Sequence, residues 1–244
     1  MRLTEPIVKE KSPLLPPLER GGIGDLVTLE QVRNHPDTKV YVRKADEFLG
    51  AIGYTEHGER HANYVSKNAR RLLQKLDFDQ KTCELAAIAG YLHDIGNVTS
   101  RVSHPVTSAF LANQILRDLG MSIEDVCTIM GAVGNHDEGC CDPVSEVSAA
   151  LIIADKSDVH RSRVRTLKEI KFDIHDRVNY AVKESHLEIN PEKRTISLHL
   201  DIDKEISDLV EYFEIFTTRM VACRKAAKLL DCQFDVVVND VEEK

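Results

Sequence analysis

Apolar residues recur at helical spacing through much of this 244-residue chain. In residues 56–75 they return every three or four positions, as on one face of an amphipathic helix. In residues 83–95 they lie on nearly all sides, as in a helix at the centre of a bundle. The helical pattern returns in three further segments, residues 106–119, 123–133 and 147–155. The pattern predicts a mainly α fold, a bundle of five or six helices ending near residue 170.

The two ends of the chain differ from this bundle. Residues 1–27 contain four of the eight prolines and a Gly-Gly-Ile-Gly stretch, which predict a lead-in without helix. Thr28-Leu-Glu-Gln31 has the form of a capping box and predicts a helix start, and a second helix is expected from Pro36 toward Gly53. The helical domain would therefore begin at about residue 28.

A β pattern follows the helices. Residues 186–202 alternate apolar and polar positions on either side of a turn, which predicts a β-hairpin. A helix over residues 204–230 and a strand over residues 234–238 would complete this part. We therefore expect three parts, namely the lead-in 1–27, a helical domain over 28–170 and a small α+β C-terminal unit over 171–244.

Composition narrows the class of protein. The formal net charge of −8 argues against a general nucleic-acid binder, which would be basic. No run of 18 apolar residues occurs, and the N-terminus lacks the features of a secretory signal, so we expect a cytoplasmic protein without a membrane segment. The six cysteines lack metal-site spacing and are expected to be free thiols. Adjacent Cys140 and Cys141 are interpreted as small apolar filler.

Histidines and aspartates of the helical region carry the candidate chemistry. His61 is followed 32 residues later by the doublet His93-Asp94, and Asp155 follows on a later helix. Placed between an apolar helix and Gly96, the Asp94 carboxylate would be buried at a cost of several kcal/mol unless a cation compensates it. A metal ion held by these four residues would compensate both carboxylates and use the imidazoles as ligands.

This arrangement resembles the HD-domain metal-dependent phosphohydrolases, whose pattern is a histidine, a His-Asp doublet and a distant aspartate. The resemblance covers residues 56–165, and its most specific part is residues 87–97, Ala-Ile-Ala-Gly-Tyr-Leu-His-Asp-Ile-Gly-Asn. In the family members that bind two metals, further histidines lie between the doublet and the last aspartate, and His104 and His136 are similar in placement. The resemblance therefore implies two divalent ions, of Mn, Fe, Ni, Co, Zn or Mg.

The first ligand has two candidates. His57 and His61 both fall on the expected opening helix, one turn apart. We prefer His61, because Val65 and Ala69 follow it at the spacing that the family shows. His57 would then support a ligand or face the substrate, or it is an ordinary histidine at a helix start.

The resemblance implies hydrolysis of a phosphate ester or nucleotide by a metal-activated water, with Asp94 bridging the two ions. We expect Asp94, His104 and Lys156 to take part in catalysis. Asp158 could orient a ligand or pair with an arginine, and Glu138 is a weaker candidate for proton transfer. The expected substrate-binding residues are His57, Lys156, Arg161, Arg163 and Arg165. The three arginines also fit a solvated charged face.

Two departures from the family exclude some of its activities. Asn97 stands where the cyclic-dinucleotide phosphodiesterases have lysine, and residues 137–143 lack their Gly-Tyr-Pro motif, so we do not expect cleavage of cyclic dinucleotides. Two alternatives remain, namely a di-iron oxygenase that uses the same ligands and a non-catalytic regulatory module that binds a metal or nucleotide. The expected partner is a small phosphorylated substrate or nucleotide, and residues 186–230 could pair two chains as a homo-oligomer.

Overall fold

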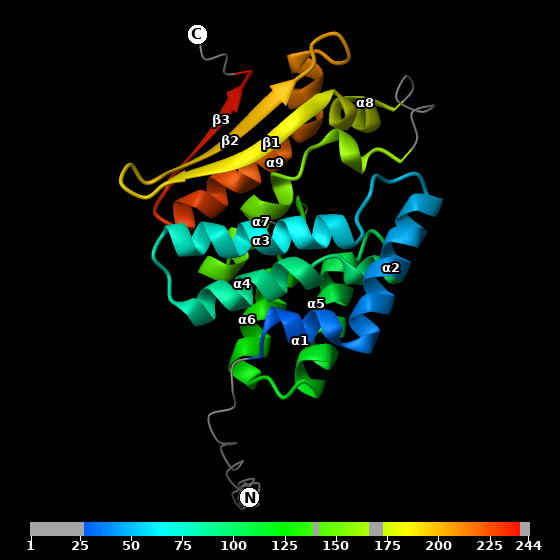
Figure 1. The fold of residues 1–244 in the computed structure, drawn as a ribbon, viewed down its shortest axis with the longest axis vertical. Coiled ribbons are helices and arrows are strands. Elements are labelled where there is room, and N and C mark those ends of the chain that lie inside the picture. The colour runs from blue at the N-terminus through cyan, green and yellow to red at the C-terminus, as the bar shows by residue number, and fades with distance from the viewer. Residues whose placement is uncertain (1–26, 139–141, 166–172, 240–244) are drawn as a thin grey trace, which may run out of the picture.

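The computed structural model describes residues 27–138, 142–165 and 173–239 (Figure 1). The lead-in and the Cys140-Cys141 pair, on which two expectations rest, lie outside these ranges. Helices come first in the chain and a small sheet lies near its C-terminal end, so the mainly α fold is confirmed. The helices of the bundle are α1 (Leu29–Asn34), α2 (Pro36–Ala51), α3 (Glu59–Lys75), α4 (Gln80–Leu92), α5 (His104–Asp118), α6 (Ile123–Gly134) and α7 (Glu146–Lys156).

Helix starts coincide with side chains that satisfy free backbone N–H groups. The capping box at Thr28 is confirmed, because the Thr28 N–H donates to Gln31 Oε1 at 2.8 Å while its hydroxyl accepts from Gln31 N–H. Pro36 occupies the first turn of α2, where no N–H is needed. Asp79 and Ser122 cap α4 and α6 in the same way as Thr28 caps α1.

Helix α4 forms the centre of the bundle. Its residues from Leu85 to Leu92 are all buried, and it packs against α3, α6 and α7. Gly90 explains how closely α3 approaches, since a Cβ at this position would lie 2.9 Å from the backbone of Ser66. Burial on every side matches the pattern without a polar face that the sequence shows for this segment.

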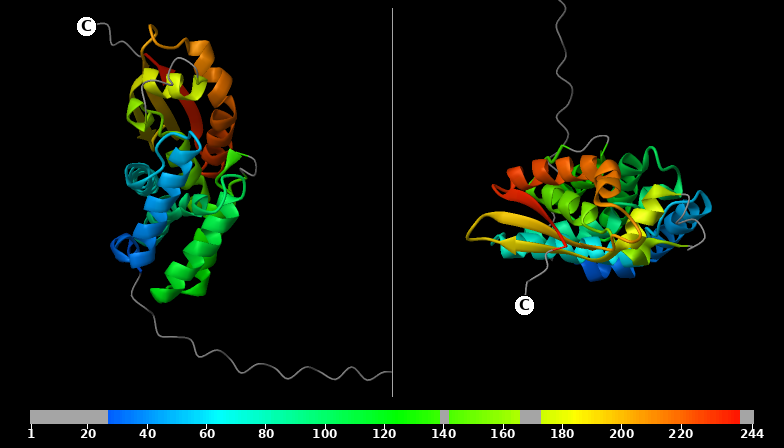
Figure 2. Two further views of the ribbon diagram at one scale, coloured as in Figure 1. Left: turned by 90° about the vertical axis from the view of Figure 1, so that its right-hand side faces the viewer. Right: turned by 90° about the horizontal axis from the view of Figure 1, so that it is seen from above.

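The C-terminal unit contains α8 (Ile174–Ala181), β1 (Val182–Asn190), β2 (Thr195–Ile202), α9 (Leu209–Leu229) and β3 (Gln233–Val238). The strand order is β1-β2-β3; β1 pairs antiparallel with β2, and β2 parallel with β3. Helix α9 makes the crossover that a parallel pair requires. It covers one face of the sheet and also packs on α7, joining the unit to the bundle (Figures 1 and 2).

Buried residues of the bundle and the C-terminal unit form one hydrophobic cluster, which includes Leu198 and Phe216. The hairpin is confirmed, although β1 begins at Val182, and β3 is confirmed within one residue. Helix α9 starts at Leu209 rather than at residue 204, because Asp203 forms a turn in which it accepts a hydrogen bond from the Glu205 N–H. Helix α8 was not expected, since eight residues are too short for a clear periodic signal.

Two expectations, on membrane-spanning helices and on the cysteines, can be compared with the structure. Within the described ranges, no helix combines the length and apolar character needed to cross a bilayer. The four cysteines that the structure describes, Cys83, Cys127, Cys223 and Cys232, are free thiols, as expected.

Candidate metal centre

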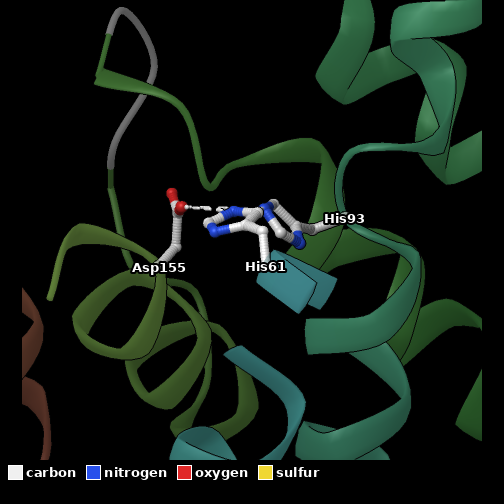
Figure 3. A group of neighbouring side chains, drawn as sticks. All are labelled: His61, His93 and Asp155. Atoms are coloured by element: carbon white, nitrogen blue, oxygen red, sulfur yellow. Dashed lines mark hydrogen bonds and ion pairs between the residues drawn. The ribbon is translucent and has the colours of Figure 1, made fainter. Parts of the chain in front are cut away.

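Six predicted ligands, which lie in or next to six helical elements, converge at one place in the bundle. His61 lies in the first turns of α3, His93 ends α4, and Asp94 leads into the 3-10 turn η1 (Ile95–Val98). His104 is the first residue of α5, His136 follows α6, and Asp155 lies near the end of α7. The four imidazoles and Asp94 are buried, and Asp155 is 12% exposed at its side chain. Figure 3 shows His61, His93 and Asp155 pointing toward one another.

Gly96 permits this convergence. A Cβ at Gly96 would lie 2.3 Å from the His104 carbonyl oxygen and 2.4 Å from the Ser108 nitrogen. The Gly96 N–H donates to the Ser108 hydroxyl at 2.7 Å, which fastens the turn to α5. Any larger residue would push α5, and His104 with it, away from Asp94.

The first half of the centre contains His61, His93 and Asp155. The Nε2 atoms of the two imidazoles face each other at 3.2 Å. Asp155 Oδ1 lies 3.3 Å from His61 Nε2 and 3.6 Å from His93 Nε2. His61 Nδ1 lies 2.6 Å from a carboxylate oxygen of Asp158, and His93 Nδ1 lies 2.9 Å from the Gly90 carbonyl oxygen.

Asp158 contacts the ligand His61 of this half, and orienting a ligand was one of the two roles that the sequence suggested for it. Its carboxylate is 1% exposed, accepts from His61 Nδ1 and takes two hydrogen bonds from the Arg60 guanidinium, at 2.8 and 3.1 Å. Arg163 Nε lies 3.7 Å away. Burial alone would raise the pKa of Asp158, but Arg163, His61 and Arg60 outweigh it and hold the pKa far below its ordinary value. Asp158 is therefore ionised and orients His61.

The second half contains His104 and His136. Their Nε2 atoms face each other at 3.1 Å, while His104 Nδ1 lies 2.7 Å from the Arg101 carbonyl oxygen and His136 Nδ1 lies 2.6 Å from that of Val133. The Arg101 guanidinium also reaches this half, with Nη1 3.2 Å from His104 Nε2. Burial lowers the pKa of both imidazoles, and that of His136 falls well below its ordinary value.

Asp94 lies between the two halves. Its Oδ2 is 3.4 Å from His93 Nε2 and 3.7 Å from His61 Nε2, whereas its Oδ1 is 3.3 Å from His104 Nε2 and 3.9 Å from His136 Nε2. Burial acts to raise the pKa of Asp94, but the surrounding imidazoles and Arg101 hold it well below its ordinary value. One ionised carboxylate thus presents an oxygen to each pair of histidines.

The donor set fits metal ions. A carbonyl or carboxylate oxygen only accepts, so each of the four rings carries its proton on Nδ1 and, when neutral, turns a lone pair on Nε2 toward its partner. Two lone pairs at 3.1–3.2 Å repel each other unless a cation lies between them. Ligand nitrogens about 2.1 Å from one ion, at angles of about 90–109°, are separated by about 3.0–3.4 Å. Among the described residues, two three-residue groups bring their ligand atoms within 4.8 Å of one another, His61-His93-Asp155 and His93-Asp94-His136, and the second group takes His93 from the first half.

The raised pKa of His93 also agrees with a site for a metal cation. Burial acts to lower the pKa of His93, but the Asp94 and Asp155 carboxylates outweigh it and raise the pKa. The two carboxylates of the first half therefore favour positive charge beside His93.

His57 precedes α3 instead of lying on it, so the prediction that one helix carries both histidines was wrong. The reason is Gly58, which is the N-cap of α3. His57 Nδ1 lies 2.7 Å from the Thr55 carbonyl oxygen, and the imidazole lines the small hollow over the ligands. Partial burial and the nearby Arg163 guanidinium hold the pKa of His57 well below its ordinary value.

Lys156 lies beside the ligands. Its Nζ is 2.8 Å from Asp155 Oδ2 and 3.8 Å from Glu138 Oε1. Burial acts to lower the pKa of Lys156, but these two carboxylates outweigh it and raise the pKa, so the side chain is a cation. Lys156 and Glu138 both line the hollow.

The side chains of the three arginines after Asp155 contact different parts of the protein. Arg163 is buried, donates to the Asp158 and Glu56 carbonyl oxygens, and lines the hollow. Arg165 instead binds Asp46 and the Tyr54 carbonyl oxygen, and Arg161 packs over the Tyr180 ring. Arg161 and Arg165 do not line the hollow, because η3 (Arg161–Arg163) and the bend after it separate the three side chains.

Two cations at the hollow were not anticipated. Arg101 and Arg219 both line it, the first from the segment before α5 and the second from α9. Neither lies near Asp155 in the sequence, and no local motif marks them. They reach the hollow only through the packing of α5 and α9.

Comparison with known proteins agrees with this geometry. The family model of the HD domain matches residues 58–212, more than half of the chain. The uncharacterized protein MJ1020 of Methanocaldococcus jannaschii is 29% identical in an alignment of 150 residues that covers 52% of this chain and 57% of that protein. The chain thus matches little more than half the length of this relative. The family match contains all six predicted ligands, and this protein belongs to the HD domain family.

Proposed function

We propose that this protein is a metal-dependent phosphohydrolase that cleaves a phosphate ester at a centre with two metal ions. The two pairs of imidazoles, with their Nε2 atoms facing each other on either side of Asp94, carry the proposal. A single structural ion would not require a second pair of buried histidines. The HD domain match supports a metal-dependent hydrolase.

The ligand assignment follows the two halves. His61, His93 and Asp155 would hold one ion, His104 and His136 the other, and Asp94 would contact both through its two oxygens. When bound, such ions lower the pKa of a coordinated water and neutralise charge on phosphoryl oxygens. The oxygen of water forms a bond to phosphorus as the ester P–O bond breaks, and the leaving oxygen takes up a proton.

The residues around the hollow suit the remaining tasks. Lys156, Arg101 and Arg163 place positive charge where the phosphoryl oxygens would lie. His57 donates through Nδ1 to a backbone carbonyl, so its neutral Nε2 can accept one hydrogen bond from a substrate or a water molecule. The catalytic candidates are Asp94 and His104, which would hold the ions, and Lys156, which lines the hollow beside Asp155.

The experiment combines metal analysis with turnover. Elemental mass spectrometry of the protein should find about two divalent ions per chain, and phosphate release from a panel of phosphate esters should stop on chelation. Asp94→Ala should lose both ions and turnover, whereas Asp118→Ala, an exposed control at the end of α5, should lose neither. Metal content without turnover would favour the oxygenase or the regulatory alternative, and no metal would contradict the ligand assignment.

A further inference from the structure

A larger cavity opens beside the metal centre. Its volume is about 340 Å³, which is within the range of pockets that hold small organic ligands. It shares four lining residues with the hollow over the ligands, namely His57, Arg101, Arg163 and Arg219. Three arginines and one histidine therefore stand where the two spaces meet. A phosphate placed at this junction would leave its organic part in the larger cavity.

Arg219 brings the C-terminal unit to this junction. Its Nε donates to Glu138 Oε1 at 2.8 Å, and its guanidinium lies 4.5 Å from the centre of the Phe216 ring. Glu138 is also the carboxylate nearest to Lys156 after Asp155. Arg219 is thus held beside two other cations, and it lies beyond residue 212, where the HD domain match ends.

Helix α8 forms one wall of the cavity. Asp173, Asp176 and Asn179 line it from this helix and its N-cap, and none of them lines the hollow over the ligands. Asn179 is 4% exposed, and its Nδ2 donates to the His175 carbonyl oxygen at 2.8 Å. Its buried Oδ1 has no hydrogen-bond partner among the described residues, which costs free energy unless a ligand donor pairs with it.

The charge therefore changes sign along the cavity. Cations at the junction with the hollow attract a phosphate, whereas the exposed Asp173 carboxylate, which lines the cavity but not the hollow, repels further anionic groups. The acceptor oxygens of Asp173 and Asn179 favour N–H and O–H donors. The exposed ring of Tyr54, which also lines the cavity and lies 5.7 Å from the Arg101 guanidinium, offers an apolar surface to the organic group.

We infer that the C-terminal unit completes the active site, with Arg219 binding the substrate phosphate and α8 enclosing a neutral, donor-bearing organic group such as a nucleoside. The expected substrate is a phosphate monoester rather than a triphosphate. This inference rests on the proposed function and assigns a task to the part of the chain that follows the metal ligands.

The role of Arg219 is tested by kinetics with AMP and p-nitrophenyl phosphate. Arg219→Ala should raise KM about tenfold or more for both esters, because both carry the phosphate; Arg219→Lys should restore part of the loss. The control is Lys225→Ala, since Lys225 also joins α9 to the loop after α6, through Asp142 at 3.0 Å, but does not line the cavity. Equal effects of the two alanine variants would mean that Arg219 only tethers the loop, and would overturn the inference.

The role of α8 is tested by substrate selectivity. Asn179→Ala should lower kcat/KM about tenfold for AMP and leave p-nitrophenyl phosphate, whose leaving group has no N–H or O–H donor before cleavage, unchanged. The control is Asn68→Ala on α3, where Nδ2 likewise donates to the carbonyl four residues earlier. Wild-type protein should prefer AMP to ATP. An equal loss on both esters, or a preference for ATP, would contradict the assignment of the α8 wall.

Failure of the proposed function can be separated from failure of this inference. If wild-type protein cleaves none of these esters with any divalent ion, the phosphohydrolase proposal fails. Calorimetric titration with AMP and adenosine then decides the inference alone. AMP binding that weakens about tenfold in Arg219→Ala but not in Lys225→Ala supports it, and equal affinities in the two variants, or no binding of AMP, would overturn it.

Discussion

The two halves of the metal centre have the same pair of histidines but different surroundings. The half with His61 and His93 has two carboxylates, Asp94 and Asp155, and a third, Asp158, that orients His61. The half with His104 and His136 shares Asp94 and has the Arg101 guanidinium at 3.2 Å from a ligand nitrogen. In the first half the cation Lys156 contacts a carboxylate oxygen, Asp155 Oδ2, whereas in the second half the cation Arg101 contacts a ligand nitrogen directly.

This difference predicts unequal affinities. A divalent ion at the first half gains attraction from two carboxylates, Asp94 and Asp155. An ion at the second half must approach Arg101, and like charges a few ångströms apart weaken binding. We therefore expect one tightly bound ion and one weaker ion, with Arg101 free to turn toward a phosphate once the second ion is bound.

The largest expected effect comes from removing one histidine from each half. His61→Ala should weaken the tight ion at least about 100-fold and abolish turnover, because the ion loses a ligand and the anchor at Asp158. His136→Ala should remove only the weaker ion. Metal titration followed by calorimetry checks both variants. Equal losses of both ions in the two variants would mean that the halves do not bind separately.

Asp158→Asn should affect the first half alone. The neutral amide can no longer stabilise the His61 imidazole as a ligand, and Arg60 keeps only its other carboxylate partner, Glu56, so affinity for the tight ion should fall about 10- to 100-fold. Calorimetry should show the weaker step unchanged. Arg60→Gln, which removes only one partner of Asp158, should have a smaller effect. If Asp158→Asn binds the tight ion with unchanged affinity, the Asp158 contact does not orient His61.

Arg101→Gln should strengthen the weaker ion. Removing the guanidinium beside His104 should tighten this step about tenfold, equivalent to about 1.4 kcal/mol, while turnover falls because a phosphate-binding cation is lost. The measurement is the second step of the same titration. Arg117→Gln, at the exposed far end of α5, is the control. Weaker binding of the second ion in Arg101→Gln would exclude competition between arginine and metal.

The smallest effect concerns a contact away from both halves. Glu211 of α9 pairs with Arg177 of α8 and accepts from Ser207, and these hydrogen bonds lower the pKa of Glu211 from 4.5 to about 2. A depressed carboxyl pKa contributes stability above about pH 4.5 that is lost as the pH falls toward 2.

Glu211→Gln should therefore lower the free energy of unfolding by about 1 kcal/mol or less at pH 7, since the pair is partly exposed, and the difference from wild type should shrink toward pH 2. Urea unfolding at several pH values measures this, with Glu214→Gln as the control on the same helix. Both metal affinities should stay as in wild type. If the difference in the free energy of unfolding between wild type and Glu211→Gln grew on acidification, the direction of this pH dependence would be contradicted.

Part of the centre could be predicted from the sequence for a physical reason, whereas His104 and His136 were expected only from the resemblance to the family. The ligands lie at helix ends in a bundle, where a strong period of apolar residues locates each helix, and a carboxylate such as Asp94 beside a buried helix requires a cation. Asp158 could also be predicted, because it lies within one helical turn of Asp155. These residues can be predicted because their spacing along the sequence is local.

The rest depends on packing between distant segments. Arg219 reaches the centre only because α9 crosses from β2 to β3 over α7, and Arg101 only because Gly96 lets α5 approach the turn. Arg161 and Arg165 have the same local pattern as Arg163, but a short turn and the bend after it direct the three side chains to different partners. No spacing rule distinguishes among them.

The most direct test of the two-ion centre is a calorimetric titration of metal-free protein with Mn²⁺, for wild type and for His136→Ala. The structure predicts two unequal steps in wild type, one tight and one weaker, and only the tight step in His136→Ala. A single step of one ion per chain, identical in both proteins, would show that His104 and His136 hold no metal and would contradict the central claim.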